Sequence, residues 1–359
     1  MFTSTLKQGT LSDMEDAPDH PVESAEPEAT SRTQSPYFRW IAMLFILVAV
    51  GLEVVYLRRP DHLAVITVFP VWVWTISLSG IAMLFGLLLS RRYCMLIVLM
   101  IGVTLFLSDT PPALVRGLYR QAPPEVRSEE DGTLRFITLN CLDTPSALLD
   151  LARYRPDVIF VEESVGPSEL EKTRLKIFGE SGHLMKDRDL AIISRFELSN
   201  VPVSRELAGY CLAGRIHVDG HSILLVPLHL NASPFRFDLW NAACWRAYTA
   251  NRRTQRSQME VIFKSIPQFD QTDAVVIGGD FNAPPGDAIF KQMPHFMRDA
   301  FHEVGVGWGC TIANDFPLIR IDQLWSTPKM HPIRCKAVKS NGSDHRAVIV
   351  DYRLLHETH

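Results

Sequence analysis

Hydrophobic and polar positions divide the chain into stretches with different patterns. Residues 1–36 show no apolar period and combine acidic side chains with scattered proline, serine and threonine, which predicts a disordered acidic tail. Residues 37–107 are dominated by long apolar runs. Residues 108–132 hold two proline pairs and mixed charges, as a linker does. From 133 to 355, short β-branched runs alternate with helical patterns and predict one α/β domain.

The apolar stretch contains three candidate membrane helices. Tyr37–Leu57 is long enough to cross a bilayer, which takes about 20 apolar residues. Leu63–Leu89 is longer, and Pro70 near its start is expected to begin or kink the helix. Tyr93–Leu107 is short for a full span and has a re-entrant or interfacial helix as its alternative. We predict about three transmembrane helices and therefore contact with a lipid bilayer.

Polar side chains gather where the predicted strands of the α/β domain end. A single such residue is usually a cap, a turn residue or a surface group. Their joint occurrence at successive strand ends favours a common site, because loops at strand ends carry function. The strands are Leu134–Leu139, Val158–Val161, Leu190–Ile193, Ile223–Pro227, Ala274–Ile277 and Ala347–Val350, and the polar residues are Asn140, Glu162, Glu163, His229, Asp280, Asn282, Asp322, Asp344 and His345.

This set of side chains fits one kind of chemistry. Carboxylate and amide oxygens are hard ligands that suit Mg²⁺ or Mn²⁺. A phosphate ester repels nucleophiles, so its hydrolysis needs a cation at the phosphoryl oxygens, an activated water and donors that follow the developing charge. The formal net charge of −4 argues against a protein that holds nucleic acid mainly through a strongly basic surface. Six cysteines without a CxxC pair indicate neither a zinc site nor a disulfide framework.

Six motifs occur in a fixed order over residues 133–352, namely LNCLD, PDVIFVEES, PLHL, GGDFNAPP, RIDQLW and SDHRAV. Together they resemble the endonuclease/exonuclease/phosphatase superfamily, whose members include nucleases and lipid or inositol phosphatases. The resemblance implies a four-layer α/β sandwich, in which two packed mixed sheets are flanked by helices. It also implies a phosphoesterase site at one edge of the sandwich.

The resemblance assigns a metal to three of the polar residues. Glu163 matches the metal-binding glutamate of the family, Asn140 matches the asparagine beside it, and Asp344 matches a second carboxylate on the metal side. The expected ion is Mg²⁺ or Mn²⁺. Glu162 departs from the glutamine that relatives often carry before the catalytic glutamate. Its negative charge either alters the metal affinity or points away at the surface, and we expect the surface position.

The resemblance also implies catalytic roles for five residues. Asp280 and Asn282 match the pair that orients the nucleophilic water and the scissile phosphate. His345 matches the proposed general base, and Asp322 matches the aspartate that fixes its tautomer. His229 matches a histidine that donates a proton to a phosphate oxygen or to the leaving group.

Aromatic and arginine residues alternate in the segment 233–256, which the family motifs do not explain. This pattern fits stacking on nucleobases, insertion into an anionic membrane interface, or an ordinary helix with a buried aromatic stripe. All three interpretations stay open. The residues are Phe235, Phe237, Trp240, Trp245, Tyr248, Arg236, Arg246, Arg252, Arg253 and Arg256.

The sequence therefore predicts a membrane-anchored, Mg²⁺-dependent phosphoesterase, of either the nuclease or the lipid and inositol phosphatase type. Its alternative is a catalytically inactive, membrane-tethered binding or scaffold domain of the same fold, which is disfavoured because every expected position is filled. A transport role is disfavoured because the apolar runs hold few ionisable residues. Flanking arginines do not decide the orientation in the cell membrane, and analogy with membrane-anchored bacterial relatives favours an extracytoplasmic domain. No protein partner follows from the sequence.

Overall fold

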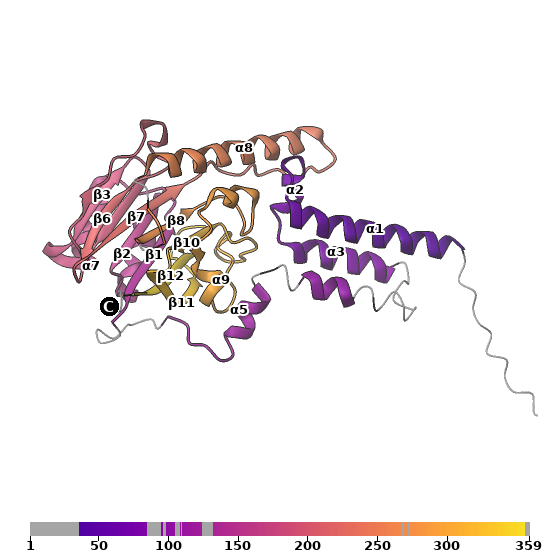
Figure 1. The fold of residues 1–359 in the computed structure, drawn as a ribbon, viewed down its shortest axis with the longest axis horizontal. Coiled ribbons are helices and arrows are strands. Elements are labelled where there is room, and N and C mark those ends of the chain that lie inside the picture. Colours follow the sequence, from indigo (N-terminus) through magenta and orange to yellow (C-terminus); the bar gives the residue numbers. More distant parts are fainter. Residues whose placement is uncertain are drawn as a thin grey trace, which may run out of the picture.

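A computed structural model of the protein describes residues 36–84, 95, 98–104, 108, 110–123, 132–266, 269–271 and 273–355. Nearly all of the predicted acidic tail, about half of the third apolar run and residues 124–131 of the predicted linker lie outside these ranges. The described residues show the predicted sandwich, with two mixed sheets packed face to face and helices on the outside (Figure 1).

Each sheet has six strands. The first sheet has the order β11-β12-β1-β2-β4-β3 and the second has the order β5-β6-β7-β8-β10-β9. The bounds are β1 (Leu134–Asn140), β2 (Val158–Glu162), β3 (His183–Asp187), β4 (Leu190–Ser194), β5 (Ser199–Asn200), β6 (Gly214–Val218), β7 (His221–His229), β8 (Ala274–Asp280), β9 (Arg298–Asp299), β10 (Asp322–Ser326), β11 (Met330–Val338) and β12 (Ala347–Leu354). Each sheet contains a parallel pair, β1 with β2 and β7 with β8, between antiparallel neighbours.

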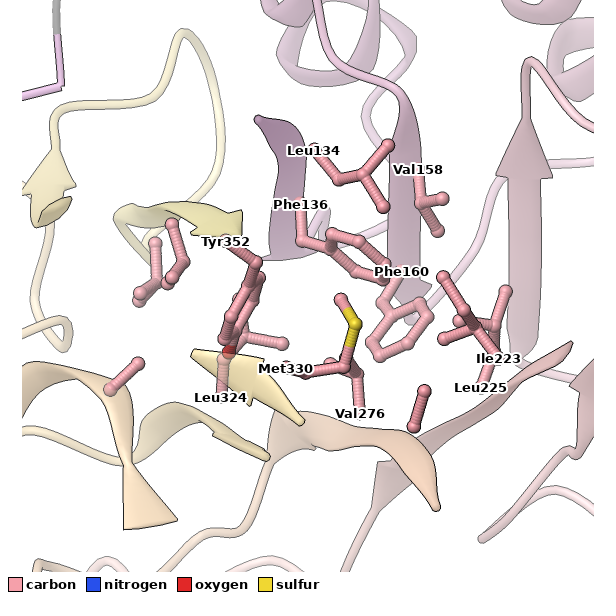
Figure 2. Close-up of a cluster of buried hydrophobic side chains, with 14 of the residues drawn as sticks. Leu134, Phe136, Val158, Phe160, Ile223, Leu225, Val276, Leu324, Met330 and Tyr352 are labelled. Carbon is pink, nitrogen blue, oxygen red and sulfur yellow. The ribbon is translucent and has the colours of Figure 1, made fainter. Parts of the chain in front are cut away.

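Strand alternation separates the core into an inner and two outer layers. Every second residue of a strand faces the same side of its sheet. Phe136 of β1 and Phe160 of β2 face inward and meet edge to face, with ring centroids 6.2 Å apart (Figure 2). The intervening residues of the same strands face outward to the helices α6 (Pro145–Asp150) and α7 (Pro167–Phe178). On the second sheet, the outer face packs against α8 (Ala242–Ser265).

The N-terminal part of the chain forms fewer candidate spans than the sequence predicts. Among the described residues, one helix is long and apolar enough to cross a membrane, or up to two if a bent pair counts as one span. The single helix is α1 (Pro36–Arg58), and its apolar window begins at Arg39. The prediction of about three transmembrane helices is therefore wrong for this part of the chain.

Proline explains the difference in the second apolar run. The chain forms a short 3₁₀ turn, η1 (Asp61–Leu63), and α2 (Ala64–Thr67), and then α3 (Val71–Leu84) begins directly after Pro70. The two parts are bent by 71°. Because proline lacks an N–H and clashes with the preceding turn, it can begin α3 but cannot continue α2 into it.

The predicted linker contains a short helix that docks on the domain. This helix, α5 (Thr110–Arg116), lies beside α9 (Ala300–Val304). The Arg116 guanidinium donates hydrogen bonds of 2.8 to 3.0 Å to the carbonyl oxygens of Phe301, His302 and Gly305. These carbonyls lie in α9 and just after its C-terminal end, where the helix dipole attracts a cation.

Candidate active site

The candidate site continues the inner face of the two sheets. On β1, Phe136 is followed on the same face by Thr138 and Asn140, and on β8, Val276 is followed by Asp280. The inner face is thus apolar in the middle of the domain and polar where the strands end. Strand register brings the other side chains to the same place, because Asn140 lies opposite Glu162, and Asp280 lies opposite both His229 and Asp322.

A hydrogen bond from one sheet to the other joins the two halves of the site. The Asn140 amide nitrogen donates to Glu163 Oε1 at 2.9 Å and to Asp280 Oδ2 at 3.1 Å. His229 Nε2 lies 3.8 Å and 3.7 Å from the same two carboxylate oxygens. We call Asn140, Glu162, Glu163, Asp280, Asp322 and His345 the carboxylate edge.

Asn140 acts as a bridging donor in this geometry. Its amide oxygen accepts a hydrogen bond from the Leu142 backbone N–H at 3.2 Å. The expected metal contact of Asn140 would use that oxygen, so it requires the amide to turn. The structure places the Asn140 amide between two carboxylates, where it holds them close together.

His345 and Asp322 form a buried pair with a defined orientation. His345 Nδ1 lies 2.9 Å and 3.1 Å from the two Asp322 carboxylate oxygens, so in the neutral ring Nδ1 carries the proton. His345 Nε2 then has a free lone pair, and it lies 3.9 Å from both Asp280 Oδ2 and Asp344 Oδ1. A water molecule between these atoms could bond to Nε2 and a carboxylate at once.

The electrostatics of this edge are dominated by carboxylates. Burial raises the pKa of Asp280, and the negative charge of Asp322 raises it further. Burial alone would lower the pKa of His345, but the charge and hydrogen bond of Asp322, together with Asp280 and Asp344, raise it to about 10. The shift of the His345 pKa reflects the carboxylates around the ring, and the shift of the Asp280 pKa reflects burial first and the charge of Asp322 second.

Glu162 is buried between the sheets, so the expectation that it points to the surface is wrong. It ends β2 on the inner face and is fully inaccessible, whereas the next side chain, Glu163, is 38% exposed. Thr138 donates a hydrogen bond of 2.9 Å to Glu162 Oε1. Burial raises the pKa of Glu162 well above its usual value, and the charge of Asp322 adds to the effect. The sequence pattern of β2 contained this signal, because Val158, Phe160 and Glu162 alternate on one face.

Unusual backbone conformations aim the side chains at the site. Glu163 and Asn282, which follow β2 and β8, have φ angles of 47° and 49°, in the left-handed region. Gly279 has a φ of 135°, and a Cβ atom there would lie 2.0 Å from the Leu228 carbonyl oxygen and 2.9 Å from Glu162 Oε1. Only glycine fits this position without moving β7 or Glu162.

Asn282 and Asp344 lie farther from the centre. The Asn282 side-chain nitrogen donates to the Leu230 carbonyl oxygen at 3.0 Å, and its backbone N–H donates to Asp280 Oδ1 at 2.8 Å. Asp344 is half exposed and reaches the site only through its 3.9 Å distance to His345. The structure therefore brings six predicted residues together closely, places Asp344 at the rim and turns the Asn282 amide nitrogen toward the loop after β7.

Ser343 supports the site and was missed by the sequence analysis. Its hydroxyl donates to the Asn140 carbonyl oxygen at 2.6 Å and accepts from the His345 backbone N–H at 3.0 Å. It thereby ties the end of β1 to the loop that carries His345. The SDH spacing was the available signal, because a serine two residues before a backbone N–H can cap a turn.

The donor set of this edge fits a hard divalent cation. Two buried carboxylates and one imidazole, from Asp280, Asp322 and His345, offer ligand atoms within 4.8 Å of one another. Asp322 already accepts the imidazole N–H through both oxygens. The carboxylates of Glu163 and Asp280, which share the Asn140 amide and lie near His229, are therefore better placed to accept a cation.

A family model for the endonuclease/exonuclease/phosphatase family matches residues 137–345, more than half of the 359-residue chain. No curated protein matches the chain.

Solved structures that match part of this chain come from several organisms. A Bacteroides vulgatus endonuclease/exonuclease/phosphatase is 14% identical, with a TM-score of 0.48, over 62% of this chain and 99% of that chain. Danio rerio TDP2, solved with a single-strand DNA product, is 19% identical, with a TM-score of 0.46 and the same two coverages. An AP endonuclease from Archaeoglobus fulgidus is 16% identical, with a TM-score of 0.44, over 62% of this chain and 100% of that chain.

Proposed function

Because the chain belongs to the endonuclease/exonuclease/phosphatase family, we propose that it is a metal-dependent phosphoesterase that hydrolyses a phosphate ester by attack of an activated water. One observation carries the proposal. Glu163 and Asp280 come from different sheets, yet both accept a hydrogen bond from the Asn140 amide, while the nearby His345 has an oriented Nε2. Cation, water and phosphate then have places within one small volume.

Each residue of the site has a separate role in the proposed hydrolysis. Glu163 and Asp280 would hold Mg²⁺ or Mn²⁺, with Asn140 and Asp344 at its margin, and the ion would withdraw charge from the phosphoryl oxygens. His345 Nε2 takes the proton of the attacking water, and Asp322 holds the ring in the tautomer that can accept it. His229, which is partly exposed beside both carboxylates, donates to a phosphate oxygen or to the leaving group.

The bound cation and the general base support each other in this scheme. A base must be neutral to accept a proton, and the pKa of His345 near 10 keeps the ring protonated at neutral pH when carboxylates alone surround it. A divalent cation held by the same carboxylates would favour the neutral ring. It would then have two effects, one on the charge of the phosphate and one on the protonation state of His345.

We also propose that the protein is attached to the cell membrane. α1 is 23 residues long, and the apolar window within it is only 17% buried in the protein. An exposed apolar helix of this length matches the thickness of a bilayer core. The substrate class stays a choice between nucleic acid and a lipid or inositol phosphate ester, with the catalytically silent scaffold as the remaining alternative.

Hydrolysis by the full-length protein in detergent tests the proposal. The substrates are plasmid DNA, sphingomyelin and phosphoinositides, each measured with Mg²⁺ and with EDTA. We expect hydrolysis of one substrate class that EDTA abolishes and that Glu163→Ala and His345→Ala each reduce by about 10²-fold to 10⁴-fold. Unchanged metal-dependent hydrolysis in both variants would exclude this assignment of the site, and no hydrolysis of any substrate would favour the scaffold.

A further inference from the structure

Three aromatic side chains protrude from the loop that joins the candidate site to α8. We call residues 233–241 the aromatic loop. Within it, Phe235, Phe237 and Trp240 are 81%, 61% and 89% exposed. Large apolar side chains that gather at one exposed place on a protein usually mark an interaction surface.

The aromatic loop is held in one position and begins close to the candidate site. Ser233 donates a hydrogen bond of 2.7 Å to the Asn282 carbonyl oxygen, on the loop after β8. Arg236 and Asp238 form a two-bond ion pair of 2.6 and 3.0 Å within the loop. Trp245 of α8 donates to the Leu239 carbonyl oxygen at 2.8 Å. The exposed rings thus project from a supported turn.

The same loop packs against the turn that follows α1. Phe237 meets Phe69 with ring centroids 5.9 Å apart. Phe69 lies between α2 and α3, and its carbonyl oxygen accepts a hydrogen bond of 2.6 Å from Tyr56, near the end of α1. Figure 1 shows α2 and the nearby end of α8 on the side of the domain from which α1 and α3 extend. The aromatic loop therefore lies at the level where α1 would leave the bilayer.

Ion pairs fix the domain to this turn. Arg252 of α8 donates to Thr67 and to Asp287, each at 2.6 Å, and all three side chains are buried. Arg256 donates to both carboxylate oxygens of Asp61, in η1. Because these contacts are buried or bidentate, the domain cannot turn freely relative to α1.

Charge favours a lipid surface over nucleic acid as the partner. Binding of single strands combines stacked aromatic rings with cations that neutralise phosphates. Here four of the five arginines in segment 233–256 already have carboxylate partners, namely Asp238 for Arg236, Asp287 for Arg252, and Asp61 for Arg253 and Arg256. Aromatic rings with little uncompensated charge suit the interfacial layer of a membrane.

We propose that the aromatic loop is a second membrane contact, which inserts Phe235 and Trp240 into the headgroup region and holds the candidate site against the bilayer. This inference rests on the proposed membrane attachment through α1. Together, the helix and the loop fix the domain at two points. The edge that carries His229 and Asn282 then faces the lipid surface at a constant distance.

Depth-dependent quenching tests this proposal without any catalytic assay. A polarity-sensitive fluorophore is attached at Trp240→Cys in the full-length protein with Cys94→Ser, since the five cysteines of the described residues are buried. The protein is placed in nanodiscs of phosphatidylcholine and phosphatidylglycerol, with and without spin-labelled lipids. Matched probes at Leu175→Cys, on the distant α7, and at Val48→Cys, on α1, serve as the solvent and membrane references.

We expect quenching at position 240 to exceed that at position 175 by about threefold or more, and quenching at position 48 to be strong. Equal quenching at positions 240 and 175, with position 48 quenched, would overturn the loop contact and leave the attachment intact. An unquenched position 48 would overturn both. Shielding of position 240 by a single-stranded oligonucleotide, in place of lipid, would overturn the choice of partner.

Discussion

The two ends of β1 hold buried charges that are balanced in different ways. At its beginning, the Arg135 guanidinium donates two hydrogen bonds to the Asp351 carboxylate, of 2.6 and 3.0 Å. The backbone N–H of Arg135 donates to the Asp157 carboxylate at 2.7 Å. At its end, Asn140 touches Glu163 and Asp280, which lack an arginine partner in the described structure.

This difference separates a structural cluster from a candidate catalytic one. A buried carboxylate is costly unless a cation or hydrogen bonds compensate it. The cluster around Arg135 carries its own cation, so it needs nothing from solution. The carboxylate edge holds one imidazole among four carboxylates, and burial together with the charge of Asp322 raises the pKa of Asp280. We infer that the first cluster stabilises the sandwich and that the second is built to accept a cation.

The largest expected effect is on catalysis, through Asp280→Asn. The substitution keeps the shape of the side chain but removes a charge at the cation and water position, so we expect a loss of hydrolysis of about 10³-fold or more. Because burial raises the pKa of the Asp280 carboxyl, the metal-free variant should unfold at the same temperature as the natural protein or higher. A large fall in thermal stability together with the lost activity would contradict this division of roles.

Arg135→Met should lower the stability of the protein and leave its hydrolytic activity unchanged, the opposite of Asp280→Asn. It leaves Asp351 buried without its main cation, and breaking a buried pair costs about 3–5 kcal/mol of unfolding free energy. Denaturant unfolding measures this loss, and the remaining folded protein should hydrolyse substrate normally. The matched double variant Arg135→Met with Asp351→Leu should recover much of the stability. A loss of turnover in folded Arg135→Met protein would remove the contrast between the two ends of β1.

A smaller effect is expected on the pH dependence of stability. The pKa of His345 is about 10 in the folded protein and 6.5 in the unfolded chain. Its contribution is therefore complete below pH 6.5 and is lost as the pH rises through 10. In EDTA, the unfolding temperature of the natural protein should decrease as the pH is raised from 6.5 to 10. The decrease should be smaller for His345→Gln. Identical pH profiles for the two proteins would mean that the His345 ring is not held protonated by its neighbours.

Most of the strands of the fold could be predicted because their apolar runs are local signals. The predicted Leu134–Leu139 and Val158–Val161 correspond to β1 and β2 within one residue at each end. Other elements depend on tertiary contacts. One example is α8, which begins at Ala242, where the Asn241 side chain caps it and its first turns pack on α2.

The site was predictable in composition but not in geometry. Polar residues next to predicted strands identified Asn140, Asp280 and His345. Asn140 and Asp280 end β1 and β8 of different sheets, and His345 precedes β12, which runs antiparallel to β1, so all three come to one edge of the sandwich. The direction of the Asn140 amide depends on two carboxylates that are distant in sequence. The burial of Glu162 depends on the second sheet, which covers the inner face of β2. The pattern of one sequence predicts which side chains share a face of a strand, but it does not predict which element packs against that face.

Titration of the full-length protein with Mn²⁺ in detergent, followed by electron paramagnetic resonance, measures whether the carboxylate edge binds a divalent cation. Glu162 and Glu163 provide a matched pair, because they are neighbours with the same side chain and only Glu163 reaches the exposed side of the carboxylate edge. We expect the natural protein and Glu162→Gln to bind Mn²⁺ alike and Glu163→Gln to bind it at least about tenfold more weakly. Equal binding by all three proteins, or none by the natural protein, would contradict this expectation.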